Sequence, residues 1–415
     1  MTTSAPAYTL IGPFSQILTM AELPENGAIS DEQLQVLENA GVLISNDEII
    51  RVDDFIKLTQ EAEQYDYAVE TIEEPLVLLP GLIDAHTHIC FAGSRANDYA
   101  MRVAGKSYLD IARSGGGILD SVRKTREATV IELVELLKRR CDRHFKEGVT
   151  TCEVKSGYGL SVDDEIKMLE AIQLVNKHHA IDLIPTCLAA HMRPPEFTES
   201  KAYLDTILQD LLPTIKEQQL ANRVDIFIED TAFTETEAIE YLLEAKKMGF
   251  DVTVHADQFT TGGSKVAVEA GALSADHLEA SGEDEITLMR NAGLVATVLP
   301  GASLGLGMHY APARKMLDGG LCLAIATDWN PGSAPMGDLL LQAALLGAAE
   351  KLTTAETLAA ITTRAARALN LSDRGQLASG LKADMIAFPT NNYKEILYFQ
   401  GKMKPSRMWK GGKEV

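Results

Sequence analysis

Two histidines stand one residue apart in the stretch PGLIDAHTHICFAGSR, which runs from Pro80 to Arg95. If the apolar residues before them form a strand, His86 and His88 point the same way and can offer two imidazole nitrogens to one ion. Other apolar runs also end in residues that can bind a metal or move a proton, namely His191, His255, His277 and Asp328.

Three histidines and one aspartate would make a typical site for a transition metal. His86, His88 and His255 supply nitrogens, and Asp328 supplies a carboxylate oxygen. This donor set suits Zn²⁺ or Fe²⁺ and leaves one position for water. A single histidine is more often a hydrogen-bonded core or surface residue, and we keep that interpretation for those in helical segments, which are His144, His178 and His179. We assign no role to His309, which follows a glycine-rich loop.

Eight short apolar runs can position these side chains. They alternate with helical segments, which is the pattern of a parallel α/β fold. The runs cover residues 82–86, 149–156, 182–191, 223–230, 251–257, 273–277, 294–299 and 321–328. Eight such strands predict an α/β fold of the (β/α)8 TIM barrel type, in which the active site lies at the C-terminal ends of the strands. The polar residues named above stand at those ends, so we expect them to converge on one mouth.

The two ends of the chain have a different pattern. Residues 1–78 alternate apolar and polar over short runs, and Asn46 and Asp47 separate two of these runs as in a β-hairpin. The late segments ADMIAFPT and PSRMWKGGKEV also resemble short strands. We therefore expect a small β-sandwich-like domain made from residues 1–78 and 370–415, with the barrel over 79–369.

Composition limits the possible partners. The chain has 415 residues and a formal net charge of −21, which argues against nucleic acid or an anionic membrane as a partner. Its five cysteines are dispersed, as expected for reduced thiols in a cytoplasmic protein. The first residues lack the basic start and the long apolar run of a signal peptide. An anionic substrate would need a local cation in so acidic a protein.

Several motifs resemble those of the metal-dependent amidohydrolase superfamily. These are PGLIDAHTH, HADQ, ADHLEA, ATDWNPGS and GQLASGLKADMIAF. The segments FAGSRANDYAMRVAGKSYLDIARSGGGI and EVKSGYGL resemble, more closely, the imidazolonepropionase family within it. The resemblance extends from about residue 75 to the C-terminus. It implies hydrolysis of the cyclic amide of 4-imidazolone-5-propanoate to N-formimidoyl-L-glutamate in histidine degradation, and it suggests a homodimer.

The resemblance also implies roles for individual residues. One Zn or Fe ion per chain (Zn²⁺, or Fe²⁺/Fe³⁺) would be held by the counterparts of His86, His88, His255 and Asp328. His277 would lie beside the metal-bound water. The implied contacts to the substrate are Arg95, Tyr158, His191, Gln258, Asn330, Gly332 and Ser333.

Opening the ring requires proton transfer, stabilisation of an oxyanion and binding of the substrate, and these residue types can supply all three. Asp328 can take a proton from the attacking water and pass it to the departing ring nitrogen. His277 can orient that water or stabilise the developing oxyanion, and the sequence does not separate the two roles. Arg95 can pair in two-pronged fashion with the substrate carboxylate. Gln258 has no proton to give but can hydrogen-bond a ring amide.

Three alternatives stay open. Related heteroaromatic deaminases usually carry a glutamate where this chain has Gln258, so the residue argues against deamination, but a deaminase or another cyclic-amide hydrolase remains an alternative. A carbamylated Lys155 bridging two metals is a second alternative. That lysine belongs on strand four, where this chain offers Glu229 and Asp230 instead, so we favour one metal. A non-catalytic scaffold is the third, and the complete ligand set argues against it.

Overall fold

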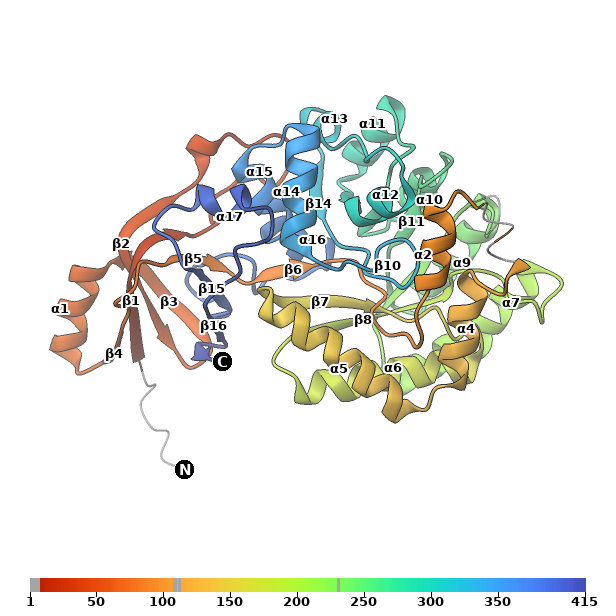
Figure 1. Ribbon diagram of the computed structural model, residues 1–415, viewed down its shortest axis with the longest axis horizontal. Helices are drawn as coiled ribbons and strands as arrows, with labels where there is room; N and C mark the ends of the chain where they lie inside the picture. Colours follow the sequence, from red (N-terminus) through yellow and green to blue (C-terminus); the bar gives the residue numbers. More distant parts are fainter. Residues whose placement is uncertain (1–7, 107–109, 111–112, 230–231) are drawn as a thin grey trace.

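A computed structural model describes residues 8–106, 110, 113–229 and 232–415. Figure 1 shows a barrel of strands wrapped by helices beside a smaller sheet, and the C-terminus lies at the smaller sheet. Asp230, one of the two carboxylates expected after the fourth barrel strand, lies outside the described residues.

The barrel strands follow the predicted order. They are β6 (Leu82–Asp84), β7 (Val149–Lys155), β8 (Asp182–Ala190), β9 (Arg223–Ile226), β10 (Asp251–Val252), β11 (Val254–Ala256), β12 (Ser274–His277), β13 (Val295–Val298) and β14 (Cys322–Ile325). Each pairs in parallel with its neighbour, and β10 and β11 are two halves of the fifth strand. A parallel bridge between Thr87 and Trp329 and the bond from the Asp328 N–H to the His86 carbonyl (3.0 Å) join the eighth strand to the first. The predicted (β/α)8 barrel is therefore confirmed.

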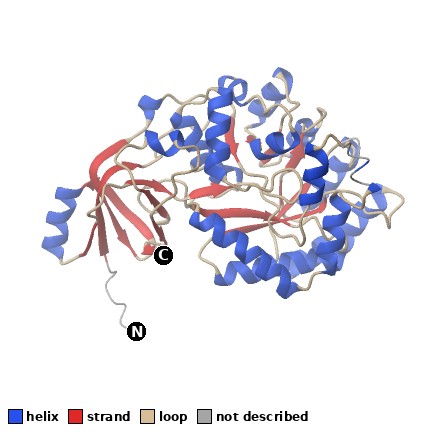
Figure 2. Cartoon of the chain, in the orientation of Figure 1, coloured by secondary structure: helices blue, strands red, loops and turns tan. Residues whose placement is uncertain are grey.

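Helices cover the outside of the barrel (Figure 2). They are α2 (Ala96–Val103), α4 (Ile118–Glu127), α5 (Val130–Lys146), α6 (Val162–His178), α7 (Ser200–Thr206), the π-helical η2 (Ile207–Leu211), α8 (Leu212–Glu217), α9 (Glu235–Lys247), α10 (Gly263–Ala270), α11 (Glu283–Ala292), α12 (Pro300–Leu306), α13 (Ala313–Asp318), α14 (Leu339–Glu350), α15 (Thr354–Ala360) and α16 (Thr363–Ala368). Helix α5 begins with a capping box in which Thr129 and Glu132 bond reciprocally, which satisfies N–H groups that the first turn leaves free. Its buried face carries Leu133, Leu137 and Cys141, spaced by four residues as a core-facing helix requires.

The smaller sheet combines strands from both ends of the chain. Its members are β1 (Tyr8–Leu18), β2 (Val36–Ser45), β3 (Glu48–Asp54), β4 (Ala68–Thr71), β5 (Val77–Pro80), β15 (Met385–Phe388), β16 (Arg407–Lys410) and β17 (Lys413–Glu414), accompanied by η1 (Asp31–Gln33), α1 (Phe55–Tyr65) and α17 (Lys394–Tyr398). Early strand β5 pairs antiparallel with late strand β15, and the Phe14 and Trp409 rings pack edge to face at 5.8 Å. Asn46 has φ +56° in the turn between β2 and β3, as the hairpin pattern requires. The domain boundaries at 78/79 and 369/370 stay predictions.

The described ranges contain no helix with the length and apolar character needed to cross a bilayer.

Candidate metal centre and active site

Three imidazole nitrogens and one carboxylate oxygen meet at the mouth of the barrel. The Nε2 atom of His88 lies 3.3 Å from that of His86 and 3.3 Å from that of His255. Asp328 Oδ1 lies 3.3 Å from His88 Nε2 and 3.6 Å from His86 Nε2. All four side chains are buried; His86 and His88 follow the first barrel strand, His255 lies in the fifth and Asp328 follows the eighth.

Carboxylates that contact His86 and His255 determine which ring nitrogen of each carries the proton. His86 Nδ1 lies 2.7 Å from Asp276 Oδ2, and His255 Nδ1 lies 2.9 Å from Asp225 Oδ2. An ionised carboxylate only accepts, so when Asp276 and Asp225 are ionised each Nδ1 carries the proton and each Nε2 presents a lone pair. Burial lowers the pKa of both imidazoles, that of His255 to about 3, so both are neutral near pH 7.

The Nε2 atom of His88 lies 3.3 Å from the Nε2 atoms of both His86 and His255. The ligand bonds of tetrahedral Zn²⁺ are about 2.0–2.1 Å, so two nitrogens bound to one ion would stand about 3.3–3.4 Å apart. The residues therefore fit a single transition metal, in the donor set that the sequence predicted.

Lys155 lies behind this centre. It ends β7, the second barrel strand, and its buried Nζ lies 2.8 Å from both Glu153 Oε2 and Asp225 Oδ2 and 3.9 Å from Asp276 Oδ2. Burial opposes its charge, but these carboxylates more than compensate and raise the pKa of Lys155. The side chain is a cation in ion pairs on strand two, which supports the preference for one metal.

Asp84, His144 and Cys152 form a second buried group of possible metal ligands. Asp84 accepts from the N–H and the hydroxyl of Thr327 (3.0 and 2.6 Å) and lies 3.0 Å from His144 Nε2. The Cys152 thiol donates to the Glu153 carbonyl at 3.3 Å, and burial raises the pKa of Cys152 well above its usual value. These side chains therefore already have partners within the protein.

Asp328 is held in one orientation by the loop that follows it. Its backbone has φ +51°, which a residue other than glycine adopts only when its surroundings impose it. Asn330 Nδ2 donates to Asp328 Oδ2 at 2.8 Å, and Ser333 Oγ lies 3.3 Å from the same oxygen. The other oxygen, Oδ1, therefore faces the histidines. Burial raises the pKa of Asp328.

A cavity of about 770 Å³ opens over the metal centre. It is lined by every predicted site residue except His86, which lies behind His88. Asn330 and Ser333, expected as contacts to the substrate, line it while their polar groups bind Asp328.

Arg95 stands on one wall of this cavity. Its Nε donates to Asp98 Oδ2 at 2.8 Å, so the edge that carries the two Nη groups is turned away from Asp98. A Cβ added to Gly332 would lie only 2.9 Å from Arg95 Cζ, so the guanidinium packs against that glycine. Arg102 bonds to the Gly332 carbonyl at 3.4 Å, and Lys106 lines the same cavity. The wall is cationic in a protein of charge −21.

Tyr158 and His191 line the same cavity, and their rings lie near that of His88. His191 Nδ1 donates to the Gly157 carbonyl at 3.0 Å, which leaves Nε2 as an acceptor, and its ring stacks on His88 with 5.3 Å between centroids. Burial raises the pKa of Tyr158, so its hydroxyl stays protonated.

Gln258 and His277 complete the lining. The loop of Gln258 is fixed by Glu229, whose carboxylate accepts from the N–H groups of Phe259 (2.7 Å) and Thr260 (3.2 Å). His277 ends β12 with φ +87°, and its ring lies 5.3 Å from that of His255.

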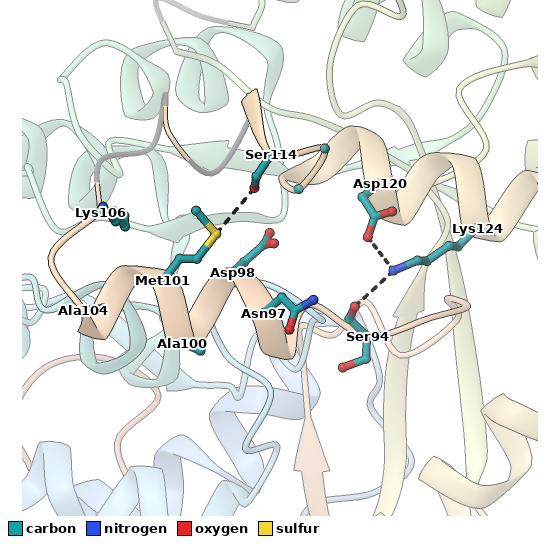
Figure 3. Close-up of a pocket in the computed structure, with 12 residues that line it drawn as sticks. Ser94, Asn97, Asp98, Ala100, Met101, Ala104, Lys106, Ser114, Asp120 and Lys124 are labelled. Atoms are coloured by element: carbon teal, nitrogen blue, oxygen red, sulfur yellow. Dashed lines mark hydrogen bonds and ion pairs between the residues drawn. The ribbon is translucent and has the colours of Figure 1, made fainter.

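A second cavity of about 520 Å³ adjoins the first, between α2 and α4 (Figure 3). Asp98 and Lys106 line both cavities. Asp98 Oδ2 also accepts from the N–H of Gly117 at 2.8 Å, so one carboxylate fixes Arg95 and the start of α4.

Three carboxylates that contact predicted site residues were not predicted from the sequence. They are Asp98, Asp225 and Asp276, which contact Arg95, His255 and His86. Asp225 and Asp276 had a readable signal, because a charged residue inside an apolar barrel strand faces either the interior or a helix and needs a partner in both cases.

Comparison with known proteins identifies relatives of the whole chain. The model of the amidohydrolase family matches residues 77–415. Curated imidazolonepropionases of Bacillus mycoides (strain KBAB4) and Bacillus cereus (strain G9842) are each 41% identical over 412 residues, covering 97% of this chain and 96% of the relative.

Solved structures share the fold at low sequence identity. A triazine hydrolase variant has a TM-score of 0.72 at 17% identity and covers 99% of this chain and 94% of its own. An adenosine deaminase from Xanthomonas campestris with bound zinc has a TM-score of 0.71 at 18% identity, with 99% and 93% covered. At such identities the likeness establishes the fold alone.

Proposed function

The chain belongs to the amidohydrolase family and, within it, to the imidazolonepropionases, and we propose from this premise how its site performs the reaction. The enzyme hydrolyses the cyclic amide of 4-imidazolone-5-propanoate to N-formimidoyl-L-glutamate, a step of histidine degradation. One observation carries the proposal for the site. Three imidazole nitrogens and the Asp328 carboxylate meet at one end of a cavity that has the Arg95 guanidinium on its wall.

The proposed cofactor is one Zn or Fe ion per chain, held by His86, His88, His255 and Asp328. When bound, such an ion lowers the pKa of a water molecule towards about 7 and polarises the carbonyl under attack. The support is the neutral state of the His86 and His255 imidazoles and the spacing of the donor atoms.

Asp328 is proposed to carry the proton. The water oxygen bonds to the ring amide carbon, Asp328 accepts the proton that the water loses, and the carbon–nitrogen bond breaks as Asp328 returns that proton to the ring nitrogen. His277 orients the water or stabilises the oxyanion. The hydrogen bond from Asn330 leaves Oδ1 of Asp328 directed at the reacting centre.

Arg95 is proposed to bind the propionate carboxylate, with Tyr158 and His191 as hydrogen-bonding neighbours. Asp98 occupies the Nε edge of Arg95, which leaves the Nη groups for a two-pronged contact. Gly332 has no side chain, which leaves room for the Arg95 guanidinium. Gln258 lines the cavity and is proposed to hydrogen-bond the ring amide of the substrate without exchanging a proton.

The alternative is another cyclic-amide hydrolase or a heteroaromatic deaminase on the same barrel. Gln258 weighs against deamination because an amide side chain cannot shuttle protons. The test is turnover of imidazolone propionate by the purified protein, with ring opening, ammonia release and metal content measured together. Ring opening without ammonia supports the proposal, and deamination of a heteroaromatic ring with an inert imidazolone would overturn it.

The proposed setting is the cytoplasm, with a small anionic substrate and a homodimer as the assembly. The five buried, unpaired cysteines support a reducing compartment. Sedimentation velocity measures the assembly directly, and a monomer at micromolar concentration would refute the dimer.

A further inference from the structure

Two buried polar atoms beside the cavity face each other with no other partner among the described residues. His277 Nδ1 and Glu279 Oε2 are both buried and make no hydrogen bond in this part of the chain. They lie 3.6 Å apart, and the two side chains are 4% and 3% exposed. An unpaired buried carboxylate oxygen is costly, so two such atoms side by side point to a shared proton.

The rest of Glu279 is anchored. Its second oxygen, Oε1, accepts from the hydroxyl of Ser303 on α12 at 2.9 Å. The backbone on either side of Glu279 is pinned to the fifth strand, because the N–H of Leu278 donates to the Ala256 carbonyl (3.0 Å) and that of Ala280 to the Asp257 carbonyl (2.8 Å). Glu279 can therefore act as a fixed point against which a neighbouring ring is oriented.

His277 needs such a fixed point. It has φ +87° and Leu278 has φ +71°, two successive left-handed residues without glycine, which persist only where surrounding contacts impose them. The strained turn brings the ring of His277 to the cavity wall. Because Nδ1 is buried, Nε2 is the ring nitrogen that can reach a ligand there.

We propose that Glu279 is a positioning residue for catalysis, which accepts the Nδ1 proton of His277 and so fixes the orientation and tautomer of that ring with Nε2 turned to the reacting centre. The proposal rests on the proposed function of His277. A separation of 3.6 Å exceeds a hydrogen bond, and a movement of about 0.5 Å would complete one, as catalytic contacts often tighten when substrate binds.

The test compares two substitutions of Glu279 in the metal-loaded enzyme. Glu279→Met keeps the length of the side chain but removes the acceptor, and kcat for imidazolone propionate should fall about 10- to 100-fold with a small change in KM. Glu279→Gln keeps an oxygen that can accept the proton and should recover part of the loss. Metal content should equal that of the wild type in both.

Repeating the substitution in a His277→Gln enzyme distinguishes a positioning role of Glu279 from a purely structural one. If Glu279 acts only through His277, Glu279→Met should cost nothing further in a His277→Gln enzyme, because the ring that it orients is absent. An equal additional loss in both backgrounds would overturn the proposal, as would wild-type kcat in Glu279→Met. Should Glu279→Met fail to fold, the comparison is made with Glu279→Gln alone, in the same two backgrounds.

The matched control is the remote pair of Asp142 and His179, whose carboxylate and imidazole are 3.1 Å apart on α5 and just beyond α6. Asp142→Asn removes the same kind of contact outside the cavity and should leave kcat unchanged.

If the wild type itself does not open the imidazolone ring, the proposed function fails. If the wild type does so and Glu279→Met matches it, only the present inference fails.

Discussion

Gly332→Ala is predicted to disable substrate binding by displacing Arg95. The new Cβ would lie 2.9 Å from Arg95 Cζ and closer still to Nη1. Carbon atoms in contact stand about 3.5–4.0 Å apart, so the guanidinium must retreat by about 0.6–1.1 Å. The φ of Gly332 lies outside the left-handed region, so the backbone accepts alanine, and the new Cβ meets the Arg95 guanidinium first and Asn330 Oδ1 next, at 3.3 Å.

A shift of about 1 Å in a positioning group can cost about 100-fold in rate. A charge-assisted contact to the carboxylate contributes about 1.5–3 kcal/mol, which corresponds to a roughly 10- to 100-fold loss when the contact is broken. We therefore expect kcat/KM of Gly332→Ala to fall roughly 10- to 100-fold for imidazolone propionate. Arg95→Met should fall by a similar factor, and Arg95→Lys should recover only part of it, because lysine lacks the planar fork.

The assay compares two substrates, the natural acid and an analogue whose propionate is replaced by a neutral amide. The wild type should prefer the acid strongly, and both Arg95→Met and Gly332→Ala should lose this preference. Combining the two substitutions should cost no more than Arg95→Met alone. Gly282→Ala is the control, since the added Cβ there would meet only the end of the Glu285 side chain, at 3.3 Å.

Retention of the acid preference by Gly332→Ala, with wild-type kcat/KM, would refute the reasoning. It would show that the guanidinium is free to move at no cost, or that another group holds the carboxylate. In the second case Arg95→Met would also keep the preference, so the two explanations are distinguishable.

The remaining predictions concern the metal, the base and the response to pH. The purified protein should carry close to one Zn or Fe per chain, and chelation should abolish activity while far-ultraviolet circular dichroism is retained; two tightly bound ions would contradict a single centre. Asp328→Asn should lower kcat at least about 100-fold with a smaller change in KM, measured by initial rates. Burial raises the pKa of Asp182, but Lys410 and Arg374 more than offset this, so its pKa in the folded protein is lowered. The stability that Asp182 contributes is present above its unfolded pKa of about 3.9 and is lost as the pH falls through its folded pKa. The Tm of the wild type should therefore drop below about pH 4, and that of Asp182→Asn should drop less.

The sequence was sufficient for the barrel because its signals are local. Each barrel strand is a short apolar run, and each predicted ligand follows such a run directly, as His86 follows β6 and Asp328 follows β14. Parallel strands bring their C-terminal ends together, so residues far apart in sequence converge without any information on pairing. The same logic explains why the structure brings the predicted residues to one cavity, although their roles stay predictions.

The positioning contacts depend on pairing between strands, which a single sequence does not encode locally. His86 meets Asp276 across the barrel, and Asp84 meets Thr327 across the seam between the first and eighth strands. The same limit applies to Asn330, which the resemblance indicated as a contact to the substrate while the structure shows its amide bound to Asp328. Only the three-dimensional arrangement distinguishes a side chain that binds a ligand from one that orients a base.

Buried charge provides an independent argument for a divalent ion. The ion pairs linked to the ligand histidines contain four carboxylates, from Glu153, Asp225, Asp276 and Asp328, and two cations, Lys155 and Arg223. These six groups together carry an excess of two negative charges, which one divalent cation would balance. In its absence the excess must be relieved by protons, and burial accordingly raises the pKa of Asp276 to about 7. A protonated Asp276 would no longer require the proton of His86 to sit on Nδ1, so loss of the metal and loss of the correct histidine tautomer are coupled through the same buried network.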